Sequence, residues 1–325
     1  MPDAFSILFP VSGVKTSVFV PPLVAMVVSF FTSMGGVSGA FLLLPFQMSV
    51  LHYTAPSVSA TNLVFNIVAI PSGVYRFIRE GRMAWPLTWV VVLGTLPGVF
   101  IGYYIRVMYL PDPKTFKLFA GCVLLYISVR LLLDLSGKQT EKKNRMKAFD
   151  EKFRERVSGM KQERKSRLAS GLPQEAVVTT ISVSVSTIEY EFWGERFSFS
   201  TAGMFLLAFV VGVIGGTYGI GGGAIIAPFC VAIFHLPVYT VAGAALMGTF
   251  ITSVAGIVFY SVMPIRGLST SPDWLLGSLF GAGGFIGIYL GARFQKYVPQ
   301  KLIRVLLGII ILFIAANYII QYVSS

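Results

Sequence analysis

The sequence predicts an all-α polytopic membrane protein built from two homologous repeats. Of the 325 residues, 55% are hydrophobic and only 12% are charged. Many apolar stretches reach about 18 residues or more, which is the length that crosses a bilayer as a helix. The second half of the chain also repeats the first half at an offset of 183 residues. Together these three observations exclude a soluble globular domain.

Eight apolar stretches are predicted to be full spans, and two shorter ones follow clusters of glycine. The predicted spans cover residues 17–34, 57–78, 86–107, 115–135, 201–216, 239–263, 274–294 and 302–322. The short glycine-broken segments cover residues 36–51 and 219–236. Each repeat therefore holds four or five hydrophobic segments, depending on whether its short segment is counted as a crossing.

The repeat is visible residue by residue and divides the chain into three parts. At the offset of 183, Gly36, Gly39, Pro45, Phe46, His52, Val58, Leu63 and Gly73 match Gly219, Gly222, Pro228, Phe229, His235, Val241, Leu246 and Gly256. With small gaps, Trp85, Gly94, Gly98 and Gly102 match Trp274, Gly283, Gly287 and Gly291. We therefore expect a first transmembrane repeat over 1–135, an insert over 136–199 and a second transmembrane repeat over 200–325.

The insert is polar and strongly basic. Residues 137–170 contain twelve Lys or Arg against five acids, and basic loops beside membrane spans stay in the cytoplasm. Residues 141–168 are predicted to form a charged helix, and the alternating pattern that ends at residue 200 predicts a small β-hairpin with its turn at Trp193, Gly194 and Glu195. The basic run directly follows a predicted membrane span, so nucleic acid is not an expected partner. We expect a multi-pass protein of the cell (inner) membrane with a cytoplasmic insert.

The number of segments in each repeat decides how the two halves are related. An odd number makes the second repeat inverted in the membrane, and an even number makes the repeats parallel. With the insert inside, the five-segment alternative also places inside a basic group made of Arg293, Lys296, Lys301 and Arg304. The charge rule therefore favours inversion. Both alternatives leave Arg106, Lys114 and Lys117 outside.

The glycine clusters are the main candidate binding residues. Paired hydrophobic halves with glycine-broken segments at corresponding positions are the best sequence indicator of a transporter binding site. A helix that restarts after such a break offers free N–H groups and a positive dipole end to an anion. The candidates are Gly36, Ser38 and Gly39 in the first copy and Gly219, Gly221, Gly222 and Gly223 in the second. The alternative is close helix packing through small residues.

The predicted span that follows the first break adds uncharged polar candidates. Asn62 and Asn66 are four residues apart, so they share one face of a helix. The corresponding span of the second repeat carries Thr249 and Ser253. Amides and hydroxyls can donate hydrogen bonds to an anion without holding it too tightly to leave. The alternative is hydrogen bonding between helices.

Three ionisable residues complete the candidate set. His52 and His235 could contact an anion or act in gating, although a histidine at a segment end is also typical of an interfacial or capping position. Arg76 could attract an anion or serve as an inside-positive anchor. We find no acid within the spans, and Glu80 and Asp134 are placed at their edges. Coupling through a buried carboxylate is therefore not expected.

The two glycine motifs resemble those of the sulfite exporter TauE/SafE family of membrane transporters. They are Gly-Ile-Gly-Gly-Gly-Ala-Ile-Ile-Ala-Pro over 219–228 and Gly-Val-Ser-Gly-Ala-Phe-Leu-Leu-Leu-Pro over 36–45. The first copy departs from the family pattern at Ser38 and Ala40, where glycine is expected. The resemblance covers both repeats, and it implies export or exchange of small sulfur-containing anions such as sulfite or organosulfonates.

Other functions remain as alternatives. A channel or carrier for other small anions or for metal ions is the main one, although metal transport would favour clusters of Asp, Glu, His or Cys within the spans. The sequence contains no HExxH or CxxC pattern, and we do not expect an enzyme or a cofactor. The predicted mechanism is alternating access around a site formed by both glycine breaks.

Overall fold

The computed structural model describes residues 5–136, 148, 151–152, 155, 177–262, 270–295, 297–298 and 300–323. The predicted basic helix over 141–168 therefore lies outside the described residues, apart from four positions within it.

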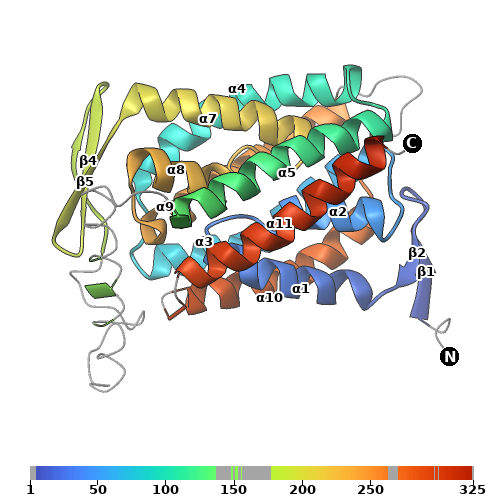
Figure 1. The fold of residues 1–325 in the computed structure, drawn as a ribbon, viewed down its shortest axis with the longest axis horizontal. Helices are drawn as coiled ribbons and strands as arrows, with labels where there is room; N and C mark the ends of the chain where they lie inside the picture. The colour runs from blue at the N-terminus through green and yellow to red at the C-terminus, as the bar shows by residue number, and fades with distance from the viewer. Residues whose placement is uncertain are drawn as a thin grey trace.

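The described residues are mostly helical, with five helices in each half of the chain (Figure 1). In the first half the helices are α1 (Val20–Met34), α2 (Ala40–Ser49), α3 (Ser57–Arg79), α4 (Trp85–Met108) and α5 (Pro113–Ser136). In the second half they are α7 (Thr201–Tyr218), α8 (Ile226–Phe234), α9 (Val238–Val262), α10 (Trp274–Phe294) and α11 (Gln300–Val323).

Seven helices of the described chain are long and apolar enough to cross a membrane, which confirms the polytopic class. These candidate spans lie in α3, α4, α5, α7, α9, α10 and α11. The sequence predicted eight full spans, and the difference lies in residues 17–34. There β2 (Lys15–Ser17) precedes the helix, and α1 has 15 residues. At 1.5 Å per residue it is about 22 Å long, short of a hydrocarbon core of about 30 Å.

The two glycine-broken segments form short helices of similar design. Gly36 and Gly219 take left-handed φ angles of 73° and 79°, and each lies between a longer helix and a short one. The short helices α2 and α8 then end just before His52 and His235, which also adopt left-handed φ angles of 55° and 54°. The matched sequence positions thus have matched backbone conformations.

Two pairs of helices pack with their main chains in close contact, α1 along α10 and α4 along α7. Glycines at every fourth position permit this approach, because a Cβ at any of them would meet a main-chain oxygen of the facing helix. On α4 and α10 these glycines are Gly94, Gly98, Gly102, Gly283, Gly287 and Gly291. The oxygens that they face belong to Phe205, Phe209 and Val213 on α7 and to Pro22, Met26 and Phe30 on α1. Both sets of contacts therefore use positions that the sequence repeat aligns.

The helical body has a different β-structure at each end (Figure 1). At one end lies the hairpin of β1 (Ser6–Leu8) and β2, from whose turn Ser12 Oγ donates a 2.8 Å hydrogen bond to Asp273 at the start of α10. At the other end lies the sheet of β3 (Thr179–Val183), β4 (Thr187–Phe192) and β5 (Glu195–Ser200). Tyr190 of β4 lies 2.9 Å from the Thr240 hydroxyl at the start of α9, which ties the sheet to the body.

The predicted β-hairpin of the insert is present as β4 and β5. Trp193 and Gly194 both take positive φ angles, 56° and 72°, between two antiparallel strands whose last pair is Phe192 and Glu195. This is the conformation of a two-residue type I′ turn. A third strand, β3, pairs antiparallel with β4 and was not predicted. Neither was the hairpin of β1 and β2.

Candidate functional site

Asn62 and Asn66 form the centre of a buried polar cluster where both glycine breaks meet α3. Both residues are fully buried. The Asn62 amide donates hydrogen bonds of 3.0 Å to Ala40 O and 3.1 Å to Gly219 O. The Asn66 amide donates to Ile220 O at 2.8 Å and to Ser253 Oγ at 3.0 Å. One turn of α3 therefore connects the first break, the second break and α9.

The first break reaches this cluster through Ser38. Its hydroxyl donates a 2.6 Å hydrogen bond to Asn66 Oδ1 and accepts one of 3.2 Å from the N–H of Ala40 at the start of α2. Gly39 lies beside it, and a Cβ there would be 2.6 Å from Ser29 Oγ. Ser38 thus links the start of α2 to α3.

The second break is built by left-handed glycines in close contact with α3 and α9. Gly219 and Gly221 have φ angles of 79° and 86°, which favour glycine. A Cβ at Gly219 would collide with the side chain of Ser59, and one at Gly221 would lie 2.9 Å from Ser253 Oγ. The N–H of Gly222 donates a 2.9 Å hydrogen bond to Thr252 Oγ1. The break is therefore anchored on both sides.

Close packing also accounts for the other glycines of the second break. A Cβ at Gly222 would be 2.7 Å from Thr95 Cβ, and one at Gly223 would be 2.5 Å from Ala245 O. A Cβ at Gly36 in the first break would lie 3.0 Å from Ala242 Cβ. The two interpretations of the glycines, chain interruption and close packing, thus apply to the same segments.

The remaining polar candidates on α9 occupy two different settings. Ser253 accepts a hydrogen bond from Asn66, so it belongs to the cluster. Thr249 donates at 2.8 Å to Ala245 O of its own helix, while its methyl group and main chain line Gly221 and Gly223. Both side chains are fully buried.

Gln47 is a member of the cluster that the sequence analysis missed. It lies on α2, is buried, and its Nε2 donates a 3.3 Å hydrogen bond to Asn62 Oδ1. Its own Oε1 is buried with no hydrogen-bond partner among the described residues. A polar residue inside an otherwise apolar half-helix was the available signal.

The amide hydrogens of both asparagines are occupied in this arrangement. Each Nδ2 group carries two hydrogens and makes two hydrogen bonds. Hydrogen bonding between helices, one of the two interpretations of Asn62 and Asn66, is therefore what the structure contains. A bound anion would have to replace one of these acceptors, and replacing Gly219 O or Ile220 O would release the second glycine break from α3.

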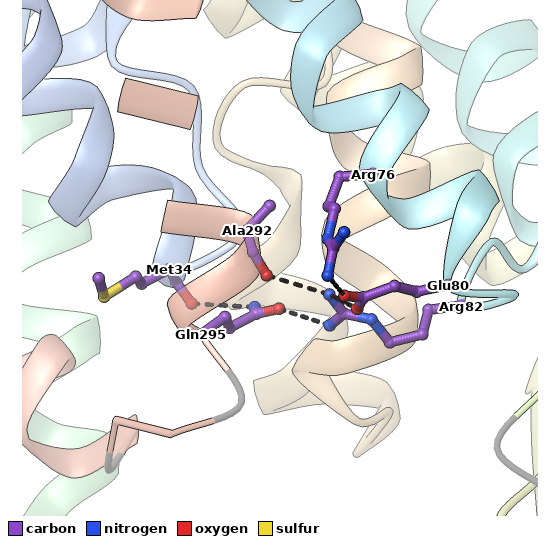
Figure 2. A network of polar contacts seen from close by, with 6 residues as sticks. All are labelled: Met34, Arg76, Glu80, Arg82, Ala292 and Gln295. Carbon is purple, nitrogen blue, oxygen red and sulfur yellow. Dashed lines mark hydrogen bonds and ion pairs between the residues drawn. The ribbon is translucent and has the colours of Figure 1, made fainter. Parts of the chain in front are cut away.

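Arg76 lies outside this cluster, in a buried ionic network at the end of α3 near the β3–β5 sheet (Figure 2). It is ten residues beyond Asn66, about 15 Å along a helix axis. Its Nη2 forms an ion pair with Glu80, and Glu80 also pairs with Arg82 at 2.6 Å. Arg82 Nη1 donates at 2.9 Å to Gln295 Oε1.

The same network reaches the end of α1. Gln295 Nε2 donates a 2.9 Å hydrogen bond to Met34 O, and Arg82 Nη2 donates a 3.1 Å one to Ala292 O (Figure 2). The sequence placed Glu80 at the edge of a span, but only 2% of it is exposed because both arginines enclose it. Burial lowers the pKa of Arg82, and Glu80 opposes this effect by favouring the charged guanidinium.

The two histidines are at the ends of the short helices. His52 is exposed and His235 is half-buried, and a complete short helix separates each one from its glycine break. The left-handed backbone of His235 ends α8, whereas α2 is capped by Val50, two residues before His52. The structure therefore does not bring them into the asparagine cluster.

A pocket lined by apolar side chains lies beside the first break. Its lining includes Val37 and Phe41 from the break and Leu131 and Leu307 from α5 and α11. Apolar walls offer no donors to an anion, so the polar cluster and not this pocket is the candidate site.

Seven apolar helices around a buried polar core that joins two interrupted segments define a multi-pass membrane protein of the transporter class. The chain belongs to the sulfite exporter TauE/SafE family, whose model matches residues 22–318. It is 21% identical over 303 residues to the probable membrane transporter protein YunE of Bacillus subtilis, covering 90% of this chain and 94% of that one. It is 28% identical over 101 residues to the probable membrane transporter protein YdhB of the same organism, covering 31% and 39%. No solved structure matches.

Proposed function

We propose that this protein moves small sulfur-containing anions such as sulfite or organosulfonates across the membrane, by alternating access around the asparagine cluster. The observation that carries the proposal is the meeting of both glycine breaks at Asn62 and Asn66. Membership of the sulfite exporter TauE/SafE family supports the substrate class.

The chemistry of the cluster favours an anion over a metal ion. The side chains that meet there are amides and hydroxyls, and the described residues contain no group of three or more His, Cys, Asp or Glu that could hold a metal ion. Donor N–H groups of the interrupted segments match the oxygens of a sulfite or sulfonate. Expelling one negative charge from a negative cytoplasm is favourable by about 2.3 kcal/mol per 100 mV.

We further propose that the two repeats are inverted and that each has five segments. The first helix of each half packs along the fourth helix of the other, which is the pattern that a two-fold relation between the halves produces. The chain enters α1 at the end with the β1–β2 hairpin, and it enters α7 directly from β5 at the opposite end. An inverted pair of repeats allows one half to rock against the other around a fixed site.

The ionic network of Arg76, Glu80 and Arg82 is the proposed closure on the insert side. It joins the end of α3 to the end of α10 and, through Gln295, to the residue before the first break. Separating these helices would require breaking buried ion pairs, so the network favours the arrangement described here.

A binding screen tests the substrate class. Purified protein is titrated with sulfite, thiosulfate, sulfoacetate, taurine and non-sulfur carboxylates, and the melting temperature is followed. We expect stabilisation by sulfur oxyanions and little by carboxylates, since a ligand that binds only the native state raises its stability. Stabilisation by carboxylates alone would contradict the proposed substrate.

Cysteine labelling tests the orientation. In a Cys122→Ser and Cys230→Ala background, Leu8→Cys lies on the exposed β1–β2 hairpin, and Ser184→Cys lies in the exposed turn between β3 and β4. An impermeant thiol reagent added to intact cells should label Leu8→Cys and spare Ser184→Cys until lysis. Labelling of both positions from outside would rule out a cytoplasmic insert and an odd number of crossings between them.

A further inference from the structure

We propose that Arg106 is the basic group of a second anion-binding subsite, at the end of the molecule opposite to the β3–β5 sheet. The subsite takes a small oxyanion of the same chemistry as the transported one, and for that chemistry the inference rests on the proposed function. Arg106 lies in the last turn of α4. The start of α4 is near the sheet, where Val178 donates a 2.8 Å hydrogen bond to Gly81 O.

Arg106 is a fully buried charge that the protein only partly satisfies. It is 0% exposed. Its Nε donates a 3.4 Å hydrogen bond to Ser59 Oγ, its Nη1 donates to Leu110 O, and its guanidinium lies 3.7 Å from the centre of the Phe116 ring. Its Nη2 is buried and has no hydrogen-bond partner within the described part of the chain. Among the residues that the structure describes, Arg106 forms no ion pair.

Arg82, the buried arginine at the opposite end of the molecule, has the kind of counter-ion that Arg106 lacks among the described residues. Arg82 is equally buried, but it has Glu80 as its counter-ion and Gln295 and Ala292 as acceptors. A buried charge without a partner is costly, and the cost is greater still in a membrane. The segment over 263–269, which is not described, carries no acid in its sequence that could serve as the counter-ion.

The surroundings of Arg106 connect it to the second glycine break. Ser59, which accepts from Nε, is the residue that a Cβ at Gly219 would strike. Tyr260 of α9 lies beside both Ser59 and Arg106, and its buried hydroxyl has no hydrogen-bond partner in the residues that the structure describes. The Tyr260 ring packs edge-on against Tyr103 at 4.7 Å. An anion at Nη2 would therefore lie one side chain away from Gly219.

The chemistry of this group selects an anion. A permanent positive charge, two hydroxyl groups and aromatic walls can bind a compact oxyanion by charge-assisted hydrogen bonds. Charge neutralisation by the ligand would remove the cost of the unpaired guanidinium. Arg106 would thus hold the anion on its way to or from the asparagine cluster.

Equilibrium dialysis with labelled sulfite tests the subsite. Arg106→Gln should bind one anion fewer per chain than the wild type. Lys114→Gln is the matched control, because it removes the same charge from an exposed position at the same end of the molecule and should bind as the wild type does. Tyr260→Phe, which removes only a hydroxyl, should weaken the affinity of that anion by about three- to tenfold.

Equal numbers of bound anions in the wild type and Arg106→Gln would overturn the inference. If Arg106→Gln does not fold, an unchanged affinity for the anion in Tyr260→Phe would overturn it. Sulfite flux measured on the same proteins separates the two proposals. If the protein transports sulfite but binding does not depend on Arg106, the subsite is wrong and the proposed function stands. If binding depends on Arg106 but the protein transports no sulfur anion, the proposed function is wrong and the subsite stands.

Discussion

Asn62 on α3 donates a 3.1 Å hydrogen bond to the main-chain oxygen of Gly219, which lies 157 residues later in the chain. The bond is buried and joins the polar helix of the first half to the glycine break of the second. Because a buried carbonyl oxygen loses its water, this amide determines how stably the break is held.

Replacing Asn66 by alanine should weaken both folding and transport. The change leaves Ile220 O without its 2.8 Å donor and Ser253 without its partner. Each buried polar group that loses its bond costs about 1–3 kcal/mol. We expect a lower melting temperature in detergent and transport reduced at least about tenfold, a loss that corresponds to about 1.4 kcal/mol.

Ser72→Ala is the control for this change. Ser72 is also buried on α3, but its hydroxyl donates at 2.8 Å to Ala69 O of its own helix. It should transport as the wild type does. Wild-type transport by Asn66→Ala would contradict the proposal that the asparagine cluster is the transport site.

Gly219→Ala should be much more harmful than alanine at another left-handed glycine. Gly219 combines a φ of 79° with the Ser59 side chain in the space that a Cβ would need. Gly13 has a φ of 69° and nothing within 4 Å of the same position. Left-handed strain alone costs about 1–2 kcal/mol. We therefore expect Gly13→Ala to lower the melting temperature slightly and to keep its transport, and Gly219→Ala to lose it. Similar effects of the two changes would mean that Ser59 readily moves aside.

Glu80→Gln should destabilise the protein more than removing the ion pair altogether. The single change leaves Arg76 and Arg82 close together with no counter-ion in a buried network. Losing one partner of a buried pair costs about 3–5 kcal/mol, whereas apolar replacement of both partners is often neutral. The melting temperature should therefore be lowest for Glu80→Gln and higher for the double variant Glu80→Leu with Arg82→Met. The opposite order of melting temperatures would show that the Glu80–Arg82 ion pair itself stabilises this end of the protein, and not only the neutralisation of the arginine charges by Glu80.

Local patterns in the sequence predicted the features that depend on neighbouring residues. The spacing of Asn62 and Asn66 placed both on one face of α3, and both do reach the cluster. The glycine motifs predicted the two breaks, and left-handed backbone occurs at Gly36 and Gly219. The two-residue turn at Trp193 and Gly194 followed from strand alternation on each side of it.

The features that depend on distant partners could not be predicted in this way. Gln47 joins the cluster because α2 folds back against α3, and Glu80 is buried because α10 brings Gln295 to Arg82. Residues 17–34 have the composition of a full span, but the first of them, Ser17, pairs with β1, and α1 begins only at Val20 and has 15 residues. Tertiary packing decides each of these outcomes.

Counterflow of labelled sulfite in proteoliposomes tests the central claim most directly. Vesicles that contain the wild type and are loaded with unlabelled sulfite should accumulate the label transiently, and vesicles with the Asn62→Leu and Asn66→Leu double variant should not. An excess of external organosulfonate should compete with the label, and an excess of a non-sulfur carboxylate should not. Counterflow by the double variant at the wild-type rate, in protein shown to be folded and inserted, would contradict the claim that the asparagine cluster is the transport site.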